Sequence, residues 1–125
     1  MSKIPVISIV DDSEPFRRAT AGLIRSLGYV AAIFPSAEEF LRSGWLDETA
    51  CLISDVQMPG MSGIDLQTHL AAQGRRLPII FVTAYPETKV REHALACGAL
   101  GFFNKPFDAD ALISCLDRAL GRGNA

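Results

Sequence analysis

Two adjacent aspartates, Asp11 and Asp12, directly follow the apolar run at residues 7–10, and a third, Asp55, follows the short run at residues 52–54. If both runs are parallel strands, their carboxyl ends lie at one edge of a sheet, where α/β proteins bind ligands. Carboxylates gathered there repel one another unless a cation lies between them. Mg²⁺ is a hard cation that prefers oxygen ligands such as carboxylates. We therefore predict a Mg²⁺ site in which Asp12 and Asp55 bind directly and Asp11 binds directly or through a water.

Two further polar residues follow later strand-like runs and indicate phosphate chemistry. Thr83 can donate a hydrogen bond to a phosphoryl oxygen, and Lys105 supplies a positive charge that offsets added negative charge. A carboxylate can attack phosphorus and form an aspartyl-phosphate. Asp55 is the best candidate for this acceptor, because it stands alone before a loop rich in glycine and proline at residues 57–63. A metal ion would bridge the attacking carboxylate and the phosphoryl oxygens.

The elements that must position these residues alternate along the chain. Apolar and β-branched runs predict strands at residues 6–10, 30–34, 51–55, 78–83 and 100–103. Helical spacing of apolar residues predicts helices that begin near Ser13, Ser36, residue 64, residue 86 and Asp108. Ser36 and Glu39 are expected to form a capping box. This alternation predicts a doubly wound α/β fold, a flavodoxin-like three-layer sandwich with a five-stranded parallel sheet in the order 2-1-3-4-5.

Composition limits the class of protein. A length of 125 residues with 49% hydrophobic and 21% charged residues predicts a single domain over residues 1–125, with a core over about 6–120 and a flexible tail at 121–125. The net charge of −2 argues against direct binding of nucleic acid or an anionic membrane. No signal peptide or membrane-spanning run is expected. The cysteines, which form no Cys-x-x-Cys motif, are expected to be buried free thiols in a cytoplasmic protein: Cys51, Cys97 and Cys115.

The whole pattern resembles the receiver domain of two-component response regulators, over about residues 7–120. The residues that carry this resemblance are Asp11-Asp12, Asp55, Met58-Pro59-Gly60-Met61-Ser62-Gly63, Thr83-Ala84 and Lys105-Pro106-Phe107. A finer similarity, to receivers of nitrogen-fixation and nodulation regulators, rests on residues 34–41 and 58–63. Those proteins carry a helix-turn-helix DNA-binding domain after the receiver, whereas this chain is expected to lack an output domain.

The resemblance implies a phosphoacceptor signalling domain with at most weak autophosphorylation and autodephosphorylation, rather than an enzyme. A sensor histidine kinase would transfer a phosphoryl group to Asp55, and Thr83 and Lys105 would contact that group. The ligands of Mg²⁺ would be the carboxylates of Asp11, Asp12 and Asp55 and the backbone carbonyl of Gln57.

The resemblance also implies a conformational switch. Thr83 would move toward the phosphoryl group, and Phe102, which lies three positions before Lys105, would turn inward behind it. Phenylalanine lacks the hydroxyl of the tyrosine often found there. Gln57, two residues after Asp55, resembles a position that tunes the lifetime of the phosphate. The switching surface would be formed by residues 86–98, 100–103 and 108–120, which the family uses for homodimerisation or output docking.

Two other functions fit parts of the pattern. A Mg²⁺-dependent phosphohydrolase could use Asp55 as its nucleophile, but it would want a second carboxylate where Gln57 stands, and no cap insertion is present. A receiver-like scaffold that acts without phosphorylation is the other possibility. Such a scaffold would have no need for the complete set of acidic residues, or for Thr83 and Lys105 in addition to them. Each of these residues alone could be an ordinary cap, turn or loop residue, but their joint placement at four strand ends favours a site.

Overall fold

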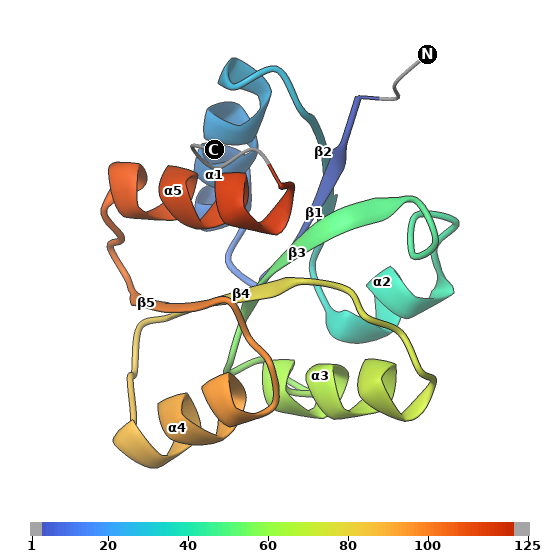
Figure 1. The fold of residues 1–125 in the computed structure, drawn as a ribbon, viewed down its shortest axis with the longest axis vertical. Helices are drawn as coiled ribbons and strands as arrows, with labels where there is room; N and C mark the ends of the chain where they lie inside the picture. The colour runs from blue at the N-terminus through green and yellow to red at the C-terminus, as the bar shows by residue number, and fades with distance from the viewer. Residues whose placement is uncertain (1–3, 122–125) are drawn as a thin grey trace.

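Residues 4–121 are described by the computed structural model, in which five strands alternate with five helices (Figure 1). The strands are β1 (Val6–Val10), β2 (Val30–Phe34), β3 (Thr49–Asp55), β4 (Ile79–Thr83) and β5 (Gly101–Asn104). The helices are α1 (Glu14–Ser26), α2 (Ala37–Arg42), α3 (Gly63–Ala72), α4 (Thr88–Ala96) and α5 (Ala109–Ala119). Apart from Gly121, the predicted flexible tail lies outside the described residues.

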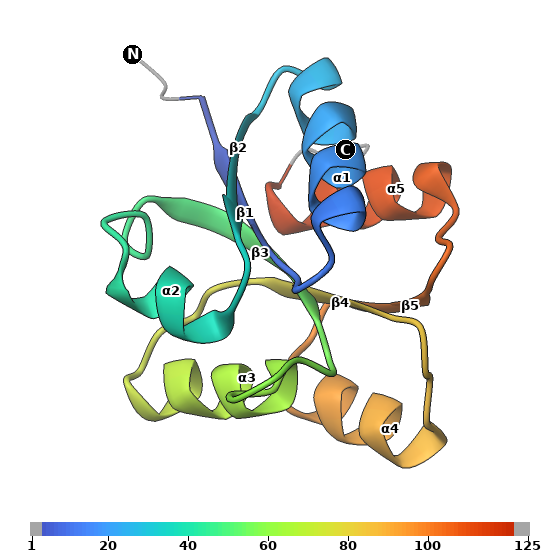
Figure 2. The same cartoon turned by 180° about the vertical axis from the view of Figure 1, so that it is seen from behind.

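The sheet is parallel throughout, and its strand order is β2-β1-β3-β4-β5. Helices α1 and α5 cover one face of the sheet, and α2, α3 and α4 cover the other (Figures 1 and 2). This arrangement confirms the predicted doubly wound fold. It also gathers the carboxyl ends of the strands at one edge, where the predicted site residues lie.

Each face of the sheet has its own hydrophobic core. On the side of α2, α3 and α4, the fully buried side chains include Phe40, Leu66 and Phe81. On the side of α1 and α5 they include Ile24 and Leu112. Burial of one such side chain contributes roughly 1.5–3 kcal/mol. Because β1 and β4 are buried along their whole length, the backbone at their carboxyl ends is held rigidly.

Local hydrogen bonds set the beginnings of most helices. The side chains of Ser13, Ser36 and Asp108 accept bonds from the first turns of α1, α2 and α5, as predicted. The capping box expected at Ser36 is only half formed, because Glu39 makes no return bond within residues 4–121. A complete box occurs at α3, where Ser62 and Asp65 each accept from the other's backbone N–H. We did not predict that box.

Helix α4 is the least buried of the helices. Its N-cap residue, Glu87, makes no capping bond with its side chain. Ala94 is the one fully buried residue among its nine, all of which the structure describes. Val90 and Leu95 pack against the core while remaining partly exposed. Helix α4 therefore contacts the core only through a narrow apolar strip formed by Val90, Ala94 and Leu95.

Other predictions of detail were wrong. Strand β3 begins at Thr49 rather than Cys51. The Thr49 hydroxyl lies 2.6 Å from the Ser8 hydroxyl of β1, and this contact brings Thr49 into the sheet two residues before the predicted start of the strand. Cys51 and Cys115 are buried, but Cys97 is exposed at the end of α4, with its Sγ 3.7 Å from His93 Nε2. No helix within residues 4–121 combines the length and apolarity that a membrane span requires.

Candidate functional site

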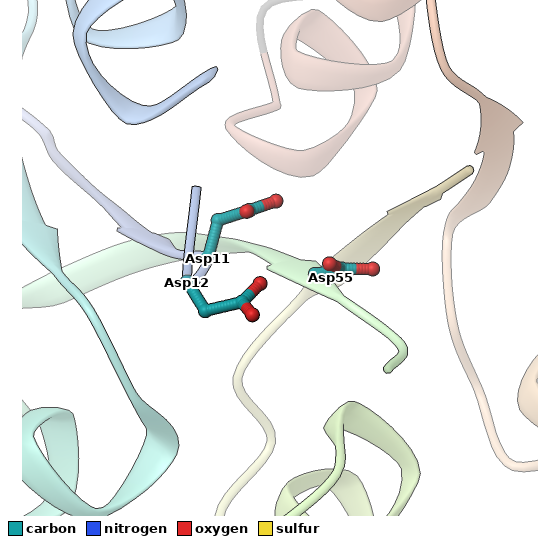
Figure 3. A group of neighbouring side chains, drawn as sticks. All are labelled: Asp11, Asp12 and Asp55. Atoms are coloured by element: carbon teal, nitrogen blue, oxygen red, sulfur yellow. The ribbon is translucent and has the colours of Figure 1, made fainter. Parts of the chain in front are cut away.

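The acidic residues meet at the carboxyl edge of the sheet. Asp11 and Asp12 follow the end of β1, and Asp55 is the last residue of β3. Because β1 and β3 are neighbouring parallel strands, one carboxylate oxygen from each residue lies within 4.8 Å of the others. Figure 3 shows the side chains of Asp11 and Asp12 extending toward the side where Asp55 lies. Asp11 and Asp55 are buried, whereas Asp12 is exposed.

Asp11 is held in place from several directions. Its Oδ1 accepts a 2.8 Å hydrogen bond from the Ser13 N–H, so the carboxylate also braces the start of α1. Its Oδ2 lies 2.7 Å from Lys105 Nζ. Its backbone carbonyl accepts a 2.7 Å bond from Arg17 Nη1. A buried carboxylate with this many charged and polar partners has little freedom to move.

Lys105 joins the two buried carboxylates. Its ammonium lies 2.7 Å from Asp11 Oδ2 and 3.4 Å from Asp55 Oδ2. The same nitrogen lies 4.2 Å from the ring centroid of Phe16, a cation–π distance. Phe16 in turn meets Phe107 edge to face, with ring centroids 6.0 Å apart. The aromatic pair thus packs α1 against the loop that carries Lys105.

Burial raises the pKa of the Asp55 carboxyl, and the neighbouring charge of Asp11 raises it further. Lys105 and the Gln57 N–H, which lies 3.3 Å from Asp55 Oδ1, act in the opposite direction but do not cancel the effect. The ionised form of Asp55 is therefore disfavoured at this edge of the sheet. A divalent cation would relieve this cost, and three clustered carboxylates of which one faces solvent fit such an ion.

Thr83 lies at the end of the next strand, β4. Its side chain is buried, and its Oγ1 accepts a 3.1 Å hydrogen bond from the Tyr85 N–H. Its backbone carbonyl accepts a 2.8 Å bond from the Lys105 N–H, which fixes the end of β4 relative to the lysine. The structure therefore places a hydroxyl and an ammonium on adjoining segments, beside the acidic group.

Phe102 lies in the sheet behind this edge rather than among the charged groups. Its ring is buried, and its centroid lies 6.2 Å from that of Phe81. It also lines an open cavity of about 510 Å³ between α4, β5 and the start of α5. The ring thus connects the core with the surface that these three elements form.

The loop from β3 to α3 closes tightly over the site. The Gly63 N–H donates a 2.8 Å bond to the Val56 carbonyl, and a side chain at Gly63 would collide with the Asp55 carbonyl oxygen. Gly60 has a φ of +77°, in the left-handed region that favours glycine. The Met61 N–H donates a 2.9 Å bond to Glu38 Oε2 of α2. Gln57, the second residue of the loop, is exposed.

The structure brings together Asp11, Asp12, Asp55 and Lys105 as predicted from the strand ends. The sequence did not reveal three residues that support them: Phe16, Arg17 and Glu38. Helical spacing identifies Phe16 only as an apolar residue, and Arg17 belongs to a pair that resembles solvated helix charges. For Glu38, the only indication in the sequence is Gly60, because a glycine in a loop can mark a point where another group, here the Glu38 carboxylate, approaches the backbone closely.

Comparison with known proteins identifies the family. The model of the response regulator receiver domain matches residues 7–117. The chain is 38% identical to nodulation protein W of Bradyrhizobium diazoefficiens over 94% of this chain and 52% of that protein. It is 34% identical to the transcriptional regulatory protein FixJ of Azorhizobium caulinodans, over 93% of this chain and 55% of that protein. It therefore spans about half the length of these curated relatives.

Solved structures agree with this match. The crystal structure of FixJ-N superposes with a TM-score of 0.83 at 30% identity and covers 100% of this chain and 99% of that one. The response regulator StyR superposes with a TM-score of 0.85 at 35% identity, over 95% of this chain and 60% of that one. Receiver domains are phosphoacceptor modules of two-component signalling, and the acidic group is consistent with their divalent metal site. The chain belongs to the response regulator receiver domain family.

Proposed function

We propose that Asp55 accepts a phosphoryl group from the phosphohistidine of a sensor histidine kinase, with Mg²⁺ as the cofactor. In this transfer an oxygen of the Asp55 carboxylate forms a bond to phosphorus. The bond from phosphorus to the kinase imidazole nitrogen breaks, and its electron pair stays on that nitrogen. The product is an acyl phosphate on Asp55. When bound, Mg²⁺ supplies positive charge that offsets the charges of the carboxylates and the phosphoryl oxygens.

The observation that carries this proposal is the bridge that Lys105 makes between Asp11 and Asp55. A lysine ammonium between two buried carboxylates is poised to exchange one of them for a phosphoryl oxygen. Asp11, Asp12 and Asp55 would hold the metal, together with the backbone carbonyl of Gln57. The Thr83 hydroxyl would leave the Tyr85 N–H and donate to the phosphoryl group.

Phosphorylation would then shift a conformational equilibrium. The phosphoryl group must bind one arrangement of Thr83 and Phe102 more tightly than the other. Phe102 lies between the Phe81 ring and the cavity bordered by α4, β5 and α5, which supports a path from the site to that surface. We propose that this surface controls a second copy of the chain or an output domain.

We propose that residues 1–125 act as a single receiver unit in the cytoplasm. The net charge of −2 supports a domain that does not itself bind nucleic acid or a membrane. Gln57 is a candidate for tuning the lifetime of the acyl phosphate, because it is exposed and adjoins the acceptor loop.

The test is to incubate the protein with Mg²⁺ and acetyl phosphate and to locate the modification by mass spectrometry. We expect an acid-labile adduct on Asp55 that is absent from Asp55→Asn. Turnover of phosphate esters without an adduct would instead indicate the hydrolase. Absence of both an adduct and turnover would overturn the proposal in favour of a scaffold that acts without phosphorylation.

A further inference from the structure

Glu38 of α2 contacts the loop that follows the acceptor strand, although nothing in its own helix relates it to the site. Its Oε2 accepts a 2.9 Å hydrogen bond from the Met61 N–H, 23 residues further along the chain. The bond is partly buried. It fastens the loop to a helix that carries no other residue of the site.

The fit between the carboxylate and the loop is close. A Cβ atom built at Gly60 would lie 2.6 Å from Glu38 Oε2, a distance that real Cβ atoms do not show. Gly60 also has a φ of +77°. The backbone conformation favours glycine at position 60, and a side chain there would displace the Glu38 carboxylate from its present position. The hydrogen bond from Met61 is the main reason that the pKa of Glu38 is lowered, so the carboxylate is ionised where it makes this contact.

The rest of the loop is fastened at its base. The Gly63 N–H bonds to the Val56 carbonyl, and the Gln57 N–H bonds to Asp55 Oδ1. Between these points lie Met58, Pro59 and Gly60, whose backbone groups make no hydrogen bond to β3 or α3 within residues 4–121. Met58 and Met61 also pack against the core, and the bond to Glu38 adds a directional polar restraint at the tip of the loop. A restraint at the tip limits the directions in which the peptide that follows Gln57 can turn.

We propose that Glu38 is a positioning residue for the metal site: by holding the loop tip it presets the Gln57 carbonyl that would bind Mg²⁺. The inference rests on the proposed function, in which that carbonyl is a ligand. Presetting a ligand reduces the ordering that binding would otherwise require, so it strengthens binding without any contact between Glu38 and the ion. Within residues 4–121, the Glu38 side chain makes no hydrogen bond to Asp11, Asp12, Asp55 or Gln57.

Glu39 offers a matched control. Both glutamates lie in the first turn of α2, so removal of either one takes the same favourable charge from the helix N-terminus. Glu39 is exposed and does not bond to the loop. The informative set of variants is therefore Glu38→Ala, Glu38→Gln, which keeps an acceptor oxygen, and Glu39→Ala.

The first measurement uses the metal-free protein and amide hydrogen exchange. We expect Glu38→Ala to speed exchange of the Met61 amide by about tenfold or more, which corresponds to the loss of roughly one hydrogen bond. Glu39→Ala should leave that rate unchanged. Unchanged exchange in Glu38→Ala would overturn the tether itself, whether or not the protein binds metal.

The second measurement is Mg²⁺ affinity by calorimetric titration, with the rate of acetyl phosphate labelling followed as Mg²⁺ increases. We expect Glu38→Ala to weaken Mg²⁺ binding by about three- to tenfold, on the scale of a lost supporting contact at a metal site. The labelling rate at saturating Mg²⁺ should remain near that of the wild type, and Glu38→Gln should recover most of the affinity. A lower melting temperature with unchanged Mg²⁺ affinity would mean a merely structural role and would overturn the proposal.

The two proposals fail in different ways. If the wild-type protein neither binds Mg²⁺ nor forms the Asp55 adduct, the proposed function fails and the positioning role fails with it. If the wild type does both and Glu38→Ala binds Mg²⁺ equally well, the positioning role alone is overturned.

Discussion

Lys105 Nζ lies closer to Asp11 Oδ2, at 2.7 Å, than to Asp55 Oδ2, at 3.4 Å. The ammonium therefore pairs most closely with the carboxylate that is completely buried, while the proposed acceptor keeps the weaker contact. This asymmetry leaves Asp55 less neutralised than its neighbour, in agreement with the direction of its pKa shift. It also makes the lysine a structural residue as well as a residue of the site.

Replacing Lys105 with methionine should destabilise the metal-free protein. The side chain of Asp11 is fully buried, so removal of the ammonium leaves a buried charge without its closest partner. We expect a loss of roughly 2–4 kcal/mol in the free energy of unfolding at pH 7. Urea unfolding measures it, and Mg²⁺ should restore part of the loss. Lys89→Met, which removes an exposed lysine from α4, is the control and should change stability by no more than about 0.5 kcal/mol.

Asp55→Asn should stabilise the metal-free protein at neutral pH. Burial and then the charge of Asp11 raise the pKa of Asp55, so the folded protein keeps this proton to a higher pH than the unfolded chain does. The free energy of unfolding of the wild type therefore falls as pH rises from the ordinary to the raised pKa of Asp55, and it stays lower above that interval. Asparagine removes this penalty, so we expect Asp55→Asn to have a higher free energy of unfolding than the wild type at pH 7.

The pH profile distinguishes this cause from a general effect of losing a charge. Urea unfolding of the metal-free protein from pH 4 to pH 8 should show the gain of Asp55→Asn shrinking toward the acidic end. Glu92→Gln, which removes an exposed charge from α4, should show no such trend. A gain that stays constant with pH, or a loss of stability at pH 7, would contradict the assigned cause.

Phe16→Leu should weaken the hold on the Lys105 ammonium. The ring centroid lies 4.2 Å from Nζ, and leucine keeps apolar volume but has no π face. A double-mutant cycle with Lys105→Met should give a coupling of about 0.5–1 kcal/mol in the free energy of unfolding. Purely additive effects would show that the ring serves only to fill space beside Phe107.

Thr83→Ala should separate phosphorylation from the conformational response. The hydroxyl bonds to the Tyr85 N–H and not to Asp55, so its loss leaves the acidic site intact. We expect labelling of Asp55 at a rate within a few-fold of the wild type, but smaller amide chemical-shift changes in α4 and β5. Thr83→Ser keeps the hydroxyl and should respond like the wild type. Full-sized shift changes in Thr83→Ala would refute the role of the hydroxyl in coupling.

Much of the fold and of the site could be predicted because both depend on local patterns. Strands buried on both faces, such as β4, are continuous apolar runs that end at a polar residue, Thr83. The acidic residues follow from the same rule, since parallel strands share one carboxyl edge. Predicted ends were off by a residue or two where the side chains are ambiguous, as at Thr49, whose hydroxyl bonds within the sheet.

Contacts between distant elements could not be predicted in this way. The approach of Phe16 to Lys105 depends on how α1 packs against the loop after β5, and the bond from Met61 to Glu38 depends on how α2 lies beside a glycine turn. Cys97 was predicted to be buried because its neighbours are small and apolar. It is exposed at the C-cap position of α4, directly before Gly98, whose positive φ of 103° ends the helix.

The shallow packing of α4 has a consequence for the energetics of local opening. A helix that buries only Ala94 completely can detach from the sheet without exposing much apolar surface. Such a segment unfolds locally at a small fraction of the free energy of global unfolding. Amides of α4 should therefore exchange with solvent long before those of β1 or β4. A modest free energy supplied by phosphorylation of Asp55 would then be enough to change the position of α4, the helix that the rest of the domain restrains least.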